Sequence, residues 1–255
     1  MTGHEKDEAA LGYRKTALGA FLAASAALTV TAGLALMMKM TMNLKKDLAT
    51  GPALIGVVLS VGLFLFANIA TIRGFSAADK AYTLLDENGC YSLGKTCKRF
   101  AIVCLIVSVV CSIVFIPSFL IIEHYTAMGS DLTDLENRAM TNLGVIMSLA
   151  IIVIQIFSCA TVYMRYLWRL SRLSKKGDAL GAFALAVTMV LAVQLVLAVI
   201  SQIFFMIGKP SGFLTDFSYI VLVIKYVLLF AYFLLRRRKL LHTAPAQERS
   251  ATEED

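Results

Sequence analysis

The chain has 255 residues, of which 58% are hydrophobic and 16% charged, and its mean hydropathy is +0.75. Soluble globular domains carry about a quarter charged residues and a smaller apolar share, so this composition excludes that class. The net charge of +7 does not predict a nucleic-acid partner, because the basic residues collect beside long apolar segments, as they do in membrane proteins.

The apolar residues form six long, nearly uncharged blocks. A hydrocarbon core of ~30 Å needs roughly 20 residues of helix, and lipid offers no partner for unpaired backbone groups. The blocks therefore predict an all-α, polytopic membrane protein with one six-helix domain over residues 17–235. The predicted spans are residues 17–38, 52–72, 100–122, 142–167, 179–207 and 213–235.

The first predicted span follows Lys6, Arg14 and Lys15, as the apolar core of a secretory signal would. Its apolar stretch exceeds the roughly 7–15 residues of such a core, so we expect a retained span. Small residues recur along it at every fourth position and would allow close helix packing, either within the bundle or against another subunit. They are Gly19, Ala23, Ala27, Thr31 and Ala35.

The connection over residues 73–99 is predicted to contain an amphipathic helix at about residues 76–87. Ser76 resembles a helix cap, and Ala78 and Tyr82 fall on one apolar stripe. Two roles remain open for this helix, since it could lie at the membrane surface or dock a cytoplasmic partner.

Two further signals concern helix ends and tails. Thr133 and Glu136 form a T-x-x-E capping box, which predicts that the fourth helix begins near Asp134. Residues 1–16 and 236–255 are predicted to be cytoplasmic tails, and we expect the polar end of the second to be disordered.

The basic residues predict the orientation. If both termini are cytoplasmic, 18 of the 24 Lys and Arg lie on the cytoplasmic side and five on the other. This asymmetry predicts an N-in, C-in protein of the plasma membrane. The compact loops and the absence of an N-x-[ST] acceptor fit a bacterial inner membrane.

The sequence does not favour an enzyme. The three histidines, His4, His124 and His242, are far apart, and no metal, nucleotide or hydrolase motif is present. Three of the five cysteines, Cys97, Cys104 and Cys111, are seven residues apart, which predicts buried, reduced thiols along one helix face. We therefore expect no catalytic residue, metal or cofactor.

Lys225 is the most informative residue of the sequence. It falls near the centre of the last span, where a lysine costs about 2.5–3.5 kcal/mol on insertion scales. Gln155 and Gln194 fall at nearly the same depth in the fourth and fifth spans. With Asn68 and Gln202 they predict a polar track, which is either a site for an anionic small ligand or a structural cluster of hydrogen bonds.

Two functions follow from these patterns. The first is a small transport component, either a solute or ion carrier or a permease-like subunit, with Lys225 at its polar centre. The alternative is a membrane scaffold or accessory subunit without a ligand, which binds other subunits through the small residues of the first span or a cytoplasmic protein through residues 76–87.

Overall fold

The computed structural model describes residues 3–44, 50–85, 88–128, 133–174, 178–209 and 211–252. Throughout these residues the regular structure is helical, which confirms the all-α prediction. The helices in chain order are α1 (Gly3–Leu44), α2 (Thr50–Leu84), α3 (Asn88–Met128), α4 (Asp134–Ile156), α5 (Cys159–Leu173), α6 (Ala179–Met206) and α7 (Gly212–Thr252).

Six segments of the described chain are long and apolar enough to cross a membrane, and each overlaps one predicted span. They are Glu5–Met38, Ile55–Leu84, Leu93–Ser118, Glu136–Leu173, Ala179–Met206 and Gly212–Leu241. The fourth consists of two helices, α4 and α5, placed end to end. Large apolar side chains such as Ile113 and Phe213 are exposed on the outside of the bundle, as lipid contact requires.

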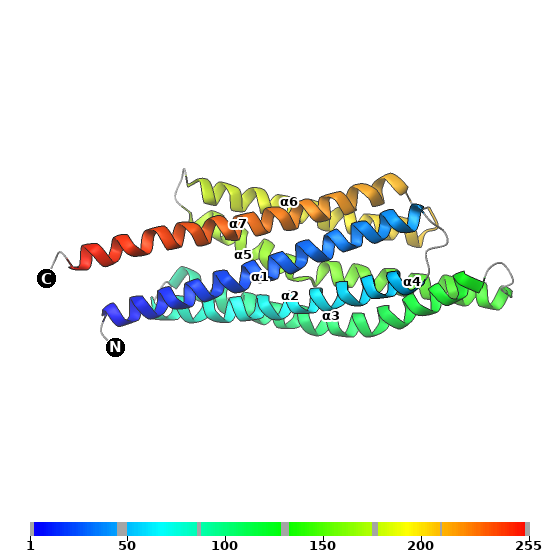
Figure 1. The fold of residues 1–255 in the computed structure, drawn as a ribbon, viewed down its shortest axis with the longest axis horizontal. Helices are drawn as coiled ribbons and strands as arrows, with labels where there is room; N and C mark the ends of the chain where they lie inside the picture. Colours follow the sequence, from blue (N-terminus) through cyan, green and yellow to red (C-terminus); the bar gives the residue numbers. More distant parts are fainter. Residues whose placement is uncertain are drawn as a thin grey trace.

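The helices lie lengthwise side by side, and both termini lie at the same end of the bundle (Figure 1). The contacts form a closed ring in which α1 packs on α2 and α7, α3 on α2 and α4, and α6 on α7, α4 and α5. Helix α5 also contacts α3 and α2.

An aromatic cluster joins α1, α2, α5 and α7. The ring of Phe21 lies 4.8 Å from that of Phe75, 5.0 Å from Phe233 and 5.7 Å from Tyr163, measured between centroids. All four side chains are fully buried. Aromatic pairs at these separations add to the stability gained from burial alone.

The separate amphipathic helix predicted for residues 76–87 is a wrong prediction. Helix α2 continues unbroken to Leu84, and its apolar stripe packs inside the bundle, with Ala78 and Tyr82 buried. The Tyr82 and Tyr166 hydroxyls lie 3.1 Å apart in a hydrogen bond. A stripe spaced like a surface helix is therefore the inner face of a long span, and residues 86 and 87 lie outside the described residues.

The chain ends also differ from the predicted tails. Helix α1 begins at Gly3, and α7 continues to Thr252, where disorder was predicted for the polar end of the chain. The part of that end that the structure describes is therefore helical. In contrast, the predicted start of the fourth helix is confirmed. Thr133 caps α4, its backbone N–H donating to Glu136 Oε2 at 2.8 Å and its hydroxyl accepting from the Glu136 N–H.

Candidate functional site

The structure brings together three of the five polar residues of the predicted track, the three that were predicted to share one depth near mid-membrane. Lys225 of α7 donates its ammonium hydrogen to Oε1 of Gln194 on α6, and each side chain is 2% exposed. The ammonium also lies 4.5 Å from the centroid of the Tyr226 ring, a favourable cation–π geometry. The burial and the hydrogen bond show how the bundle accommodates this cation.

A small cavity of about 10 Å³ adjoins this pair. A space of that size is at the lower limit for a single water molecule. Gln155 is among its lining residues, none of which is acidic. They are Gln155, Ser158, Ala160, Thr161, Met164, Leu191, Gln194, Leu195 and Lys225.

The fourth span is broken beside this cavity. Helix α4 ends at Ile156, Ser158 is extended with φ −84° and ψ 157°, and α5 begins at Cys159. The Ser158 hydroxyl donates to the Gln155 carbonyl at 3.1 Å, and the Thr161 hydroxyl donates to the Ser158 carbonyl at 2.7 Å. These side chains satisfy carbonyls that the break releases, as a broken span inside a membrane requires.

The break places the N-terminus of α5 against the Lys225 cavity. The first N–H groups of a helix have no partner within it and carry partial positive charge. The Ser158 side chain makes no capping hydrogen bond to them. The cavity therefore combines an ammonium group, two side-chain amides and a helix N-terminus, and this donor-rich chemistry suits an anion.

The other two predicted residues are not in the lining of this cavity. Asn68 is buried on α2, donating to the Phe64 carbonyl at 2.9 Å, while its own Oδ1 accepts no hydrogen bond from the residues described. Gln202 is half-buried on α6, eight residues from Gln194, or about 12 Å along the helix axis. The continuous polar track predicted from these residues is therefore reduced to the three-residue cluster.

The small-residue ridge of α1 lies at the edge of the buried face. Ala27 is buried, Gly19, Thr31 and Ala35 are half-buried, and Ala23 is exposed. A Cβ at Gly19 would meet no atom within 4 Å. The ridge is thus not closely packed within the chain along its whole length.

The buried cysteines lie as the seven-residue spacing predicts. Cys97, Cys104 and Cys111 are buried along one face of α3, and Cys159 is buried on α5; all four are free thiols. The Cys104 thiol donates to the Ser158 carbonyl at 3.7 Å. The Cys104 thiol therefore helps to satisfy a backbone carbonyl at the break in the fourth span.

A larger cavity, which the sequence did not predict, opens at the end of the bundle that holds the termini. We call this cavity of about 400 Å³ the vestibule. Its lining residues come from α1, α2, α5, α6 and α7 and the connection between α5 and α6. The polar ones are Arg14, Tyr82, Tyr166, Ser174, Asp178, Tyr232, Arg236 and Lys239.

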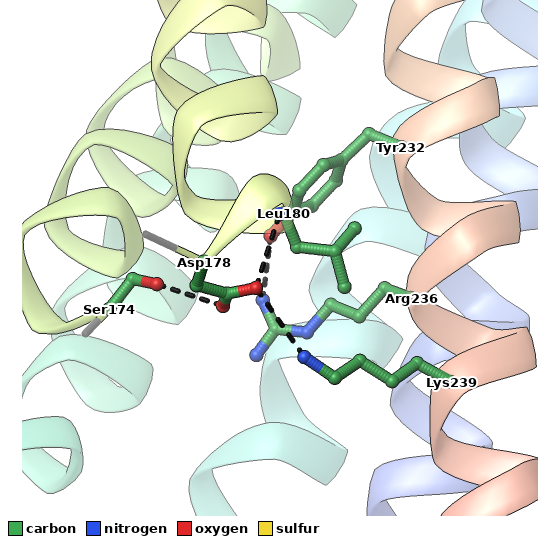
Figure 2. A network of polar contacts seen from close by, with 6 residues as sticks. All are labelled: Ser174, Asp178, Leu180, Tyr232, Arg236 and Lys239. Atoms are coloured by element: carbon green, nitrogen blue, oxygen red, sulfur yellow. Dashed lines mark hydrogen bonds and ion pairs between the residues drawn. The ribbon is translucent and has the colours of Figure 1, made fainter. Parts of the chain in front are cut away.

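Asp178 links two sides of the vestibule, as Figure 2 shows. It accepts from the Ser174 hydroxyl at 2.9 Å and the Leu180 N–H at 3.2 Å, and lies 3.5 Å from the Lys239 ammonium. The Ser174 hydroxyl, then the Leu180 N–H and the Lys239 charge, hold the pKa of this carboxyl below its usual value. It is therefore ionised at neutral pH.

The vestibule keeps an excess of positive charge. Arg236 donates to the Tyr232 hydroxyl at 2.9 Å, and its guanidinium lies 6.0 Å from the centroid of the Tyr166 ring. Arg14 and Lys239 contribute two more cations, against the single carboxylate of Asp178. The cavity therefore favours anions near its mouth.

Residues that line the vestibule and residues that line the Lys225 cavity lie on the same faces of α6 and α7. On α7, Lys225 and Arg236 are eleven residues apart, which returns to nearly the same side of a helix at 3.6 residues per turn. Tyr163 of α5, Val187 of α6 and Leu229 of α7 each fall, along their own helix, between residues that line one cavity and residues that line the other, and all three are fully buried. We call these three residues the barrier layer.

Fold and site together define a multi-pass helical membrane protein with a buried cationic centre. Comparison with protein-family models, with curated proteins and with solved structures finds no significant match to this chain.

Proposed function

We propose that the protein is a small membrane transport component that moves an anionic solute or ion, alone or as a permease-like subunit. The midplane site consists of Lys225, Gln155, Gln194 and the N-terminus of α5. The vestibule gives access to this site from the cytoplasm, and the barrier layer closes the route. We place the protein in the plasma membrane, the inner membrane of a bacterium, with both termini cytoplasmic.

The buried ammonium of Lys225 carries this proposal. A charged lysine at the bilayer centre is costly, so such residues are retained mainly where they bind ligands or ions. No acidic residue lines its cavity, which leaves the positive charge available to an anion. The broken fourth span adds a helix N-terminus, which transporters use to hold anionic groups.

The conformation described is closed. The cavity beside Lys225 has room for about one water molecule, so a solute enters only after the Lys225–Gln194 hydrogen bond opens and the barrier layer separates. Such alternation between closed and open forms is how membrane transporters commonly work.

The alternative function is a scaffold or accessory subunit without a ligand. Two observations favour it: the Lys225 cluster is tightly packed, and Gly19 and Ala23 on the ridge of α1 are not buried. In that case the Gly19–Ala35 ridge would contact another membrane subunit. The exposed side of α2 near its end, at Lys80 and Thr83 within residues 76–87, would contact a cytoplasmic protein.

The test replaces Lys225 with Met and, separately, with Arg. The matched control is Lys209→Met, which removes an exposed lysine after α6. Each protein is purified in mild detergent, its yield and monodispersity are compared, and it is reconstituted into liposomes that report the flux of chloride, nitrate and phosphate.

Transport predicts that Lys225→Met lowers anion flux at least tenfold at normal yield, while Lys225→Arg retains part of the flux and the control all of it. Flux that survives Lys225→Met contradicts the proposed site. Loss of yield alone, together with a partner that co-purifies from native membranes, supports the accessory function.

A further inference from the structure

A second basic site lies on the outside of the bundle, away from the vestibule. Helix α5 carries Arg165, Arg169 and Arg172 on one face, at positions i, i+4 and i+7, with Trp168 between them. All four side chains are exposed. They line a cavity of about 740 Å³ between α3, α5 and α6, which we call the arginine groove.

The arginine groove has a polar and an apolar part. Its apolar lining comes from Leu93 of α3, Met164 of α5, and Leu185 and Met189 of α6. Trp168 is 46% exposed, and the Arg172 guanidinium lies 4.4 Å from the centroid of its ring. Among the described residues that line the groove, none carries a carboxylate.

The two parts lie at different depths in the membrane. Because α5 begins beside the midplane cavity, a rise of 1.5 Å per residue puts Arg165, Arg169 and Arg172 about 9, 15 and 20 Å from its start. Half of the hydrocarbon core is about 15 Å thick. Arg169 and Arg172 therefore reach the headgroup level, and the long side chain of Arg165 can extend toward it.

The apolar residues lie deeper. Met189 and Leu185 precede Gln194 by five and nine residues on α6, which puts them about 8 and 14 Å from the midplane. Met189 is 60% exposed, and at this depth only lipid or another protein in the membrane can cover it. The groove thus has cations at the headgroup level and an apolar wall deeper in the hydrocarbon core. A phospholipid in the same leaflet has its charged headgroup and its acyl chains at these two depths.

We propose that the arginine groove binds an anionic phospholipid, with its phosphodiester held by the three arginines and its upper acyl chains against Met164, Leu185 and Met189. Arginine donates in a planar fork that matches phosphate oxygens. Basic pockets between transmembrane helices bind anionic headgroups in this way. This site is independent of the proposed transport function.

The chain supplies its own probe, because Trp168 is the only tryptophan in the sequence. The purified protein is reconstituted into vesicles of phosphatidylcholine and phosphatidylglycerol in which either lipid carries brominated acyl chains. Bromine quenches tryptophan on contact, so the two quenching curves give the relative affinity of the groove for the anionic lipid.

Three proteins are compared: the wild type, Arg165→Gln/Arg169→Gln/Arg172→Gln, and the control Arg73→Gln/Arg237→Gln/Arg238→Gln. The control removes the same charge from exposed residues outside the groove. We expect a preference for phosphatidylglycerol of at least about threefold in the wild type and the control, since each arginine near the surface adds appreciable attraction. The preference should fall to about one in the groove variant, and it should weaken in high salt.

Equal quenching by the two lipids in the wild type would overturn the proposal. So would a preference that survives loss of the three arginines. Protection of Trp168 from both lipids would also overturn it, because the groove would then be covered by a second copy of the chain.

Discussion

Among the residues that the structure describes, the Lys225 ammonium is stabilised by one neutral acceptor rather than by a counter-charge. The Gln194 carbonyl oxygen accepts its hydrogen bond and the Tyr226 ring adds a cation–π contact. A buried polar group that loses its only strong partner bears its full desolvation cost, whereas removing both partners is close to neutral. The two residues should therefore be energetically coupled.

We predict that Gln194→Leu lowers the stability of the folded protein by about 1–3 kcal/mol, since it leaves a buried ammonium without its acceptor. The double variant Lys225→Met/Gln194→Leu should be more stable than Gln194→Leu alone. Thermal unfolding in mild detergent, followed by size-exclusion chromatography, measures both. Gln202→Leu on the same helix is the control and should change stability little, because Gln202 is only half-buried. Additive effects of the two substitutions would show that the side chains are not coupled.

The sequence could predict the depth of polar residues but not all of their contacts. Lys225, Gln155 and Gln194 were found by counting residues from the ends of their spans, because helical rise converts position into depth. The vestibule could not be found in this way. Arg14, Asp178 and Arg236 come from distant parts of the chain, and their convergence depends on how the helices pack.

A glycine of α2, Gly74, leaves space for an aromatic ring of α1. A Cβ added at Gly74 would overlap the Phe21 ring, which is fully buried and held by the aromatic cluster. The ring cannot move aside without disturbing Phe75 and Phe233. Gly74 is thus required by packing, even though glycine lowers helix propensity.

We predict that Gly74→Ala destabilises the protein by about 1–3 kcal/mol, as expected of overpacking in a filled core. The matched control is Gly62→Ala on the same helix, where a Cβ would meet nothing within 4 Å. That substitution should be neutral or slightly stabilising, because alanine is the better helix former. Melting temperatures in detergent distinguish the two. Equal effects of both substitutions would contradict the close packing at Phe21.

Among the elements, the sequence predicted the six spans, because each apolar block exceeds the thickness of the hydrocarbon core. It did not predict the break in the fourth, since no Gly or Pro marks it. The only local signal is Ser158, a favourable helix-capping residue, followed by Thr161. The separate helix predicted for residues 76–87 was wrong for a different reason. An amphipathic stripe has the same spacing whether its apolar face contacts lipid or another helix.

At the scale of the molecule, both ends of the chain lie at one end of the bundle (Figure 1). The basic residues predict that this end is cytoplasmic. We predict that reporter fusions at the N-terminus and the C-terminus both give cytoplasmic signals. A reporter after residue 45, between α1 and α2, serves as the control and should give the opposite signal. Termini on opposite faces would contradict an even number of spans, and two external termini would contradict the orientation.

Over residues 212–241, α7 crosses the whole bundle as one uninterrupted helix. Lys225 and Arg236 therefore belong to one continuous helix and move together when that helix moves. Any tilt or turn that widens the mouth around Arg236 also shifts the Lys225 ammonium relative to Gln194. A bulky protein fused to the C-terminal end of α7 would therefore disturb the vestibule and the midplane site together, because a force on that end tilts the whole helix.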